Sequence, residues 1–283
     1  VLFGVAAYQL NMFFNTTMIA RFDGMVTLLN YVQNIVIYMV LAFIYSVTAV
    51  VYPKLTASFT RGDMADYKAT LAGVLESTAA LLVPITFGFI TVRRPLLELI
   101  ANYGKITSTD IDRACMLIVM YSIGILGVGL KEILDRAFYA AKNTMLPAVN
   151  GFIIMAVNVT LSLVLTRFIG AYGIPLAYST ASLVGLCVLL ALLHRKIGVF
   201  AKGLGMTLVK CLVSALAMAG AVLAVNAGLD AVLVSDSVLT RLIKLAIPAC
   251  VGVLVYGVMV LVLRVNAVKP VLAKIKTLVK RGA

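Results

Sequence analysis

Apolar residues dominate this chain in long runs, and polar residues are gathered into short segments between them. Eight runs lie near residues 1–20, 26–52, 74–92, 114–134, 146–166, 172–193, 206–227 and 242–263. An α-helix needs about 20 apolar residues to cross a bilayer. The runs also lack the polar and apolar alternation of a membrane β-barrel. The pattern therefore predicts an all-α integral membrane protein with eight transmembrane helices.

Prolines and polar linkers divide these runs. Pro53 is expected to end the second helix, because its ring cannot continue one. Pro84 lies within the third run and Pro175 near the start of the sixth; in a membrane such prolines are tolerated where neighbouring helices bond the freed carbonyl. The last two runs follow the polar segment "HRKIGVFAKGLG" and differ in texture, being rich in Ala, Val, Leu and Gly. We therefore expect a six-helix unit over 1–200, two appended helices over 201–265, and a basic tail over 266–283.

Charge indicates how the helices are oriented. Only 12% of the residues are charged and the formal net charge is +13, whereas soluble domains are about 25% charged. Alternate loops and the C-terminal tail contain 15 Lys and Arg residues, and the intervening loops contain 7. The positive-inside rule places the C-terminus and the start of the first helix in the cytoplasm. The basic tail is expected to meet anionic lipid headgroups rather than nucleic acid.

The chain opens inside an apolar run with "VLFGVAAYQL" and has no initiator Met. We therefore expect it to be the carboxyl part of a longer protein, preceded by an N-terminal lobe.

Residues suited to catalysis are scarce. Cys115, Cys187, Cys211 and Cys250 all fall within apolar runs without CxxC spacing, and His194 is the only histidine. No HExxH motif, Ser/His/Asp set or phosphate-binding glycine loop is present. We expect no enzymatic activity, no cofactor and no metal site.

Polar residues inside the second run suggest a cavity. At 100° per residue one helix face collects Asn30, Gln33, Asn34, Tyr38, Tyr45, Thr48 and Tyr52. Hydrogen bonds between helices explain two or three such groups, but seven on one face favour a hydrated cavity. The candidate substrate-cavity residues are Asn30, Gln33, Asn34, Tyr38 and Tyr45, together with Asn15 of the first run.

Shorter polar pairs and a lack of acids complete this pattern. Asn11 with Asn15, Asn158 with Ser162, and Tyr178 with Ser179 and Ser182 each share a helix face. Each set is typical of contacts between helices, and all are compatible with one central cleft. Glu76 is the only acid expected near membrane depth, and its position predicts an interfacial location. A proton or sodium relay is therefore not expected.

The segment "LKEILDRAFYAAKNTMLP" predicts a cytoplasmic hairpin. It contains two opposite-charge pairs at i, i+4, Lys131 with Asp135 and Glu132 with Arg136, a spacing that stabilises helices. Phe138 and Tyr139 suit the headgroup zone. Asn143 or Thr144 can cap the next helix, with Pro147 in its first turn. A structural role explains this segment without any chemistry.

Several segments together resemble a known family. "NYVQNIVIYMVLAFIYSVTAVVYPKLTASFTRGD", "RAFYAAKNTMLPAVNG" and "GIPLAYSTASL…HRKIG" are similar to segments of the MurJ/MviN lipid II flippases, within the multidrug/oligosaccharidyl-lipid/polysaccharide (MOP) exporter superfamily. The resemblance covers about residues 8 to 200. It implies two six-helix lobes followed by two helices, of which this chain would supply the second lobe and the final pair. It also implies alternating-access transport of lipid II across the bacterial inner membrane, with the last two helices holding the lipid tail.

The same resemblance implies roles for particular residues. Asn34 stands where the family usually has Arg or Lys, and Asn15 stands where an acid is common. Asn15, Asn158, Ser162 and Tyr178 would form a vestigial cation site, so sodium coupling is not expected at this lobe. Arg136, Tyr139 and Asn143 match the family's cytoplasmic hairpin, with Asn143 in place of the usual Asp.

The expected partners are a lipid-linked glycan precursor, membrane lipids and the N-terminal lobe. The alternatives are a flippase for another lipid-linked polysaccharide, a multidrug antiporter, and a non-transporting scaffold for cell-wall enzymes.

Overall fold

The computed structural model describes residues 2–22, 24–101, 107–198, 202–233 and 237–265, and all regular structure in them is helical. The α-helices are α1 (Leu2–Ile19), α2 (Met25–Gln33), α3 (Met39–Thr60), α4 (Met64–Ala101), α5 (Ser108–Ser122), α6 (Ile125–Ala140), α7 (Met145–Ile169), α8 (Gly173–Ile197), α9 (Lys202–Val232) and α10 (Val238–Val262). A π-helical segment, Asn34–Tyr38, joins α2 to α3, and a 3-10 turn, Gly170–Tyr172, joins α7 to α8. The basic tail predicted over 266–283 lies outside the described residues.

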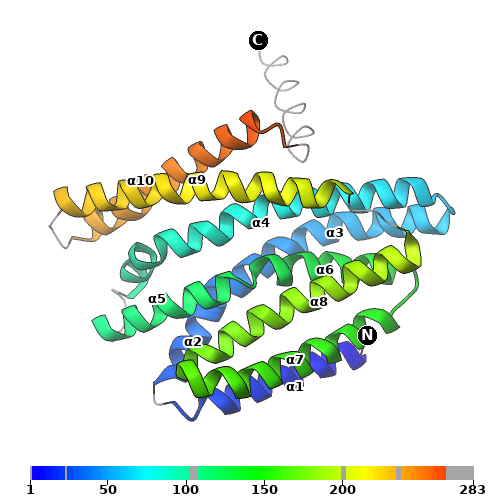
Figure 1. Ribbon diagram of the computed structural model, residues 1–283, viewed down its shortest axis with the longest axis horizontal. Coiled ribbons are helices and arrows are strands. Elements are labelled where there is room, and N and C mark those ends of the chain that lie inside the picture. Colours follow the sequence, from blue (N-terminus) through cyan, green and yellow to red (C-terminus); the bar gives the residue numbers. More distant parts are fainter. Residues whose placement is uncertain (1, 23, 102–106, 199–201, 234–236, 266–283) are drawn as a thin grey trace.

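The helices run roughly side by side along the length of the molecule (Figure 1). α9 and α10 form one edge and pack on α4, while α1 and α7 form the opposite edge. α3, α6 and α8 lie between these edges and make most of the core, together with α4 and α5. Tyr67 of α4 is fully buried there and donates a hydrogen bond to the Ala137 carbonyl of α6 at 2.8 Å.

Among the described residues, five continuous helical stretches are long and apolar enough to cross a membrane, and six if the bent pair α5 and α6 counts as one span. One of the five, Met145–Ile197, contains both α7 and α8, which pack against each other. The prediction of an all-helical, membrane-spanning chain is therefore confirmed at this level, and the division into eight spans stays a prediction.

The helix of the second run does not end at Pro53. α3 continues through this proline to Thr60, and a tight turn at residues 61–63 leads into α4. A proline removes only one helical hydrogen bond, and the last turn is held by contacts beyond it. Leu55 and Ser58 are buried, and the Ser58 hydroxyl donates to the Asp66 carboxylate of α4. Packing against α4 therefore outweighs the missing bond.

The fourth run is not one helix. It divides at Gly124 into α5 and α6, which are bent by 42°. Hydroxyls of α8 bond carbonyls at this break: Ser179 donates to Met120 at 2.6 Å, and Ser182 to Gly124 at 3.4 Å. A side chain on Gly124 would collide with Ser179, so this glycine allows α8 to pack closely at the break.

Candidate substrate cavity

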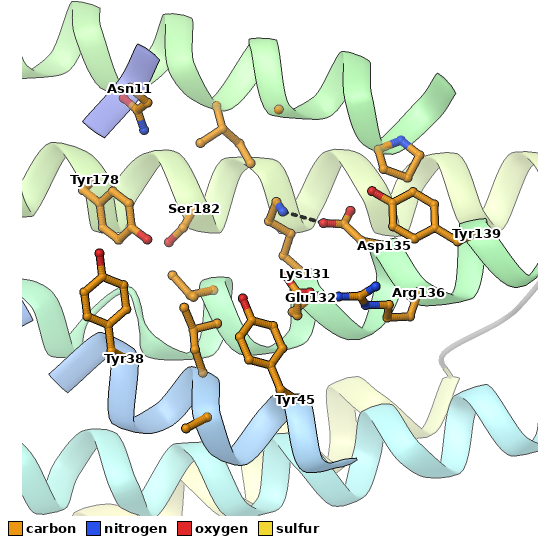
Figure 2. Close-up of a pocket in the computed structure, with 16 residues that line it drawn as sticks. Asn11, Tyr38, Tyr45, Lys131, Glu132, Asp135, Arg136, Tyr139, Tyr178 and Ser182 are labelled. Carbon is orange, nitrogen blue, oxygen red and sulfur yellow. Dashed lines mark hydrogen bonds and ion pairs between the residues drawn. The ribbon is translucent and has the colours of Figure 1, made fainter. Parts of the chain in front are cut away.

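A cavity of about 570 Å³ lies between α3, α6, α7 and α8, and its polar lining comes from ten residues. These are Asn11, Tyr38, Tyr45, Lys131, Glu132, Asp135, Arg136, Tyr139, Tyr178 and Ser182, and Figure 2 shows them around one space. The volume is within the range of small-molecule sites. Tyr45 is 48% exposed, which places part of the lining at the surface of this chain.

α6 supplies four charged groups to this cavity. Lys131 donates to Asp135 at 2.5 Å, and Arg136 pairs with Glu132 at 3.2 Å. The Asp135 and Glu132 side chains are only 10% and 18% exposed. Removing charges from water is costly unless they are paired, so the two pairs explain how α6 can hold four charges among apolar helices.

The two ion pairs do not satisfy every polar atom of these four side chains. The Oδ1 atom of Asp135 and the Nε atom of Arg136 are buried and have no hydrogen-bond partner among the described residues. A buried polar atom without a partner costs about 1–3 kcal/mol. Asp135 and Arg136 line the cavity, but these two atoms are closed to it in this conformation, so a ligand would reach them only if the side chains turned.

Tyrosines form the remaining polar wall. Tyr38 and Tyr45 project from the π-helical segment and α3, and Tyr178 projects from α8 on the far side (Figure 2). Tyr178 is held edge-to-face by Tyr121, with ring centroids 6.0 Å apart. Phenol groups combine an apolar ring with a hydroxyl, so this wall suits a ligand that carries both sugar rings and hydroxyl groups.

The π-helical segment explains why the predicted stripe is divided. A helix plotted at 100° per residue keeps its seven polar residues on one face, but a π-turn adds a residue and rotates the later part of the helix. Tyr38 and Tyr45 line the cavity. Asn30, Asn34 and Tyr52 are exposed outside it, Thr48 is buried, and buried Gln33 approaches the Met12 sulfur at 3.6 Å. Asn30, Gln33 and Asn34 therefore remain predictions as substrate contacts.

A second polar cluster lies between α1 and α7. The Asn158 amide donates to the Oδ1 atoms of Asn11 and Asn15, the latter at 2.9 Å, and the Ser162 hydroxyl lies 3.5 Å from the Asn158 oxygen. All four residues are buried. The structure thus brings together Asn15, Asn158 and Ser162 of the predicted vestigial cation site. Tyr178 belongs to the cavity instead, and Asn11 touches both.

The hairpin residues have two different roles. Asn143 caps α7 as predicted, since its Oδ1 accepts from the Leu146 N–H at 3.2 Å. Arg136 and Tyr139 line the cavity, with the guanidinium carbon 5.9 Å from the Tyr139 ring centre. Phe138 is 1% exposed and packs in the core rather than facing outward, and its level in the membrane stays a prediction.

Asp135 is 7% exposed and therefore buried among the helices, whereas the sequence pattern predicts only a hairpin role for Lys131, Glu132 and Asp135. The sequence feature that indicates a cavity role for these residues is the occurrence of four charges within one otherwise apolar helix.

The fold is that of an all-helical membrane protein with a polar cavity between its helices. The family model described as lipid II flippase MurJ matches residues 1–242. The chain belongs to this family, and the resemblance to it in the sequence is confirmed.

Relatives in several bacteria support this assignment. A probable lipid II flippase MurJ of Vibrio cholerae is 27% identical over 195 residues, which cover 68% of this chain and 37% of that protein. The lipid II flippase MurJ of Burkholderia cenocepacia is 26% identical over 202 residues, which cover 70% of this chain and 38% of that protein. The chain thus spans less than half the length of these relatives.

A solved structure has the same fold. A lipid II flippase MurJ in an inward closed conformation superposes with a TM-score of 0.73 at 21% identity, covering 90% of this chain and 51% of that one.

Proposed function

We propose that this chain is the second half of a lipid II flippase, which moves a polyprenyl-diphosphate-linked peptidoglycan precursor across the bacterial inner membrane by alternating access. The family match over residues 1–242 carries this proposal. The cavity between α3, α6, α7 and α8 is the part of the substrate route that this half supplies.

The cavity chemistry suits such a substrate. A diphosphate needs fixed positive charge and hydrogen-bond donors, which Lys131 and Arg136 present on one helix. Hydroxyl-rich sugars need both donors and acceptors, which the tyrosine hydroxyls and the Ser182 hydroxyl provide. A disaccharide-peptide headgroup exceeds the volume of this cavity. A preceding six-helix lobe is therefore proposed to enclose the rest of it.

Eight spans are proposed for the chain. Met145–Ile197 contributes two of them, because α7 and α8 each have 25 residues and pack side by side. α1 contributes another, since its 18 residues extend about 27 Å at 1.5 Å per residue. With α2–α3, α4, α5–α6, α9 and α10 this makes six helices in the lobe and two appended ones. The excess of Lys and Arg in alternate loops supports a cytoplasmic C-terminus.

The other candidate substrates are lipid-linked polysaccharides without the peptide. The test is to express the full-length protein in cells depleted of their own lipid II flippase, and to measure flipping in vesicles that contain labelled lipid II or a peptide-free polyprenyl-diphosphate glycan. We expect growth to be restored and lipid II to be moved in preference. If only the peptide-free glycan is moved, that glycan replaces lipid II as the proposed substrate. If nothing is moved but recruitment of wall enzymes is restored, the scaffold function is favoured.

A substitution ties this activity to the cavity. Arg136→Gln removes the cavity's guanidinium charge but keeps an amide, so flipping should fall roughly tenfold, as loss of a charge-assisted contact does. Arg195→Gln is the matched control, because Arg195 is exposed near the end of α8 and lies outside the cavity. Equal flipping by the two variants, at equal membrane levels, would remove the cavity from the substrate route.

A further inference from the structure

α4 contains two internal prolines, Pro84 and Pro95. A proline has no N–H, so it cannot bond the carbonyl four residues earlier. Ala80 and Thr91 therefore lose their ordinary helical partners. Where the surroundings are lipid, a carbonyl without a partner must find a donor on a neighbouring helix.

Both carbonyls find this donor on the appended helices. The Tyr256 hydroxyl of α10 donates to the Ala80 carbonyl at 2.6 Å, and the Asn226 amide of α9 donates to the Thr91 carbonyl at 3.2 Å. Both donors are half-buried. Two polar side chains from two different helices thus bond the two carbonyls that the prolines release.

A third bond lies at the end of the same helix. The Arg241 guanidinium of α10 donates from Nη1 to the Glu98 carbonyl at 3.2 Å. Glu98 is in the last turn of α4, where carbonyls have no helical partner. The appended pair is therefore attached to α4 by directed hydrogen bonds at three levels, in addition to apolar contacts.

One of these levels leads toward the cavity. Leu82 lies between Ala80 and Pro84, is fully buried, and occupies the space that a side chain on Gly129 would take. Gly129 is on α6, between Val128 and Lys131, and both of these line the cavity. A continuous line of contacts thus runs from Tyr256 through α4 to the charged helix.

We propose that Tyr256 and Asn226 are positioning residues, which couple the α9–α10 pair to the cavity by fixing the shape of α4 at its two prolines. The inference rests on the proposed transport function. A hydrogen bond within a helix holds its shape independently of the neighbouring helices. A hydrogen bond donated by another helix instead makes the shape of the first depend on the position of the second. Displacement of α9–α10, the surface proposed for the lipid tail, is then passed to Leu82 and α6.

The test first removes the Tyr256 hydroxyl, and then restores the helical hydrogen bond that this hydroxyl replaces. Tyr256→Phe deletes the hydroxyl and keeps the ring, and it should lower flipping by the full-length protein roughly two- to tenfold, the range of one net hydrogen bond. Adding Pro84→Ala to this variant restores an N–H that can bond Ala80 within the helix. The double variant should regain the hydrogen bond within α4 but not the bond from α10 to α4. Its flipping should therefore stay low.

A second measurement reports coupling without relying on transport. Ala42→Cys places a thiol on the cavity wall, and its modification by a membrane-impermeant maleimide can be followed at that site by mass spectrometry. In the parent, detergent-solubilised protein given a polyprenyl phosphate should show a changed modification rate, because the proposal requires a lipid tail bound at α9–α10 to displace this pair. In Tyr256→Phe, and in the double variant, the lipid should change this rate by less than half as much.

Tyr31→Phe is the matched control, because the Tyr31 hydroxyl is buried but has no partner among the described residues. It should match the parent in both measurements. A merely structural role for Tyr256 predicts that Pro84→Ala restores both flipping and the lipid response, which would overturn the proposal. So would a full lipid response in Tyr256→Phe itself.

If the Tyr256 variant does not fold, Asn226→Leu alone and with Pro95→Ala repeats the design at the second proline. The lipid response separates the two proposals. If the protein moves another glycan while its variants lose the lipid response, the coupling proposal holds and the lipid II proposal fails.

Discussion

The two polar groups inside this apolar bundle are built in opposite ways. The asparagine cluster of α1 and α7 is neutral and buried, and Asn158 is shared between Asn11 and Asn15. The α6 group is charged and lies beside a cavity, and Asp135 and Arg136 keep atoms without partners. Both groups occur at comparable spacing in the sequence, but four residues of the second line the cavity, whereas only Asn11 of the first reaches it.

This difference separates attachment from recognition. A polar cluster whose members bond one another stabilises helix contacts and has little left to offer. A cluster with unused atoms is less stable than it could be, and such a cost is expected where a ligand completes the bonding. We therefore assign substrate contact to the α6 group and attachment of α1 to α7 to the asparagine cluster.

Lys131→Met should have the largest effect. It leaves the Asp135 carboxylate without its 2.5 Å partner, and an unpaired charge at this depth destabilises by on the order of 3 kcal/mol. Flipping should be lost, and the thermal unfolding midpoint of the detergent-purified full-length protein should fall. The measurements are the midpoint and flipping per folded protein.

The double variant Lys131→Met/Asp135→Leu separates the two consequences. Replacing both charges by apolar groups removes the unpaired carboxylate, so the unfolding midpoint should recover most of its loss. Flipping should not recover, because the cavity has lost its ammonium group and its free oxygen. Recovered flipping would show that the pair serves stability alone and would end the contrast between the two polar groups.

Asn158→Leu should have a smaller effect, and it should change stability rather than flipping. It removes the amide that bonds Asn11 and Asn15, so unfolding should become easier by about 1–3 kcal/mol. Flipping per folded protein should change little. Reduced flipping without a fall in the unfolding midpoint would place the asparagine cluster in the transport route.

The positions of the helices could be predicted from hydropathy, because each long apolar run must be covered by lipid or by other helices. The runs correspond to the described helices, apart from local differences that include the passage through Pro53 and the break before α6. Tertiary contacts decide those differences: Ser58 bonding Asp66 carries α3 past Pro53, and Ser179 with Ser182 stabilises the break before α6. Asp66 lies beyond the turn that follows α3, and Ser179 and Ser182 come from α8, so the pattern of one run cannot reveal either contact.

The cavity could be predicted only in part. Tyr38 and Tyr45 were found because polar side chains within an apolar run are unusual. Asn30 and Asn34 were grouped with them because a regular helix was assumed, and the π-helical segment at Asn34–Tyr38 separates the two pairs. Lys131 and Asp135 were assigned to a surface hairpin because i, i+4 ion pairs are common on exposed helices. Depth in the bundle depends on packing, which spacing does not contain.

The smallest effect is expected from sodium. A cation site needs oxygen ligands that are free to coordinate, and carboxylates are the strongest of these. In the asparagine cluster the oxygens of Asn11 and Asn15 already accept from Asn158, and no acid belongs to the group. Replacing sodium by choline on both sides of the vesicle membrane should therefore leave flipping unchanged within about twofold, as no binding energy is lost. A sodium requirement that Asn158→Leu abolishes would show that this cluster still binds the ion, whereas one that persists in the variant would place the ion in the other half of the protein.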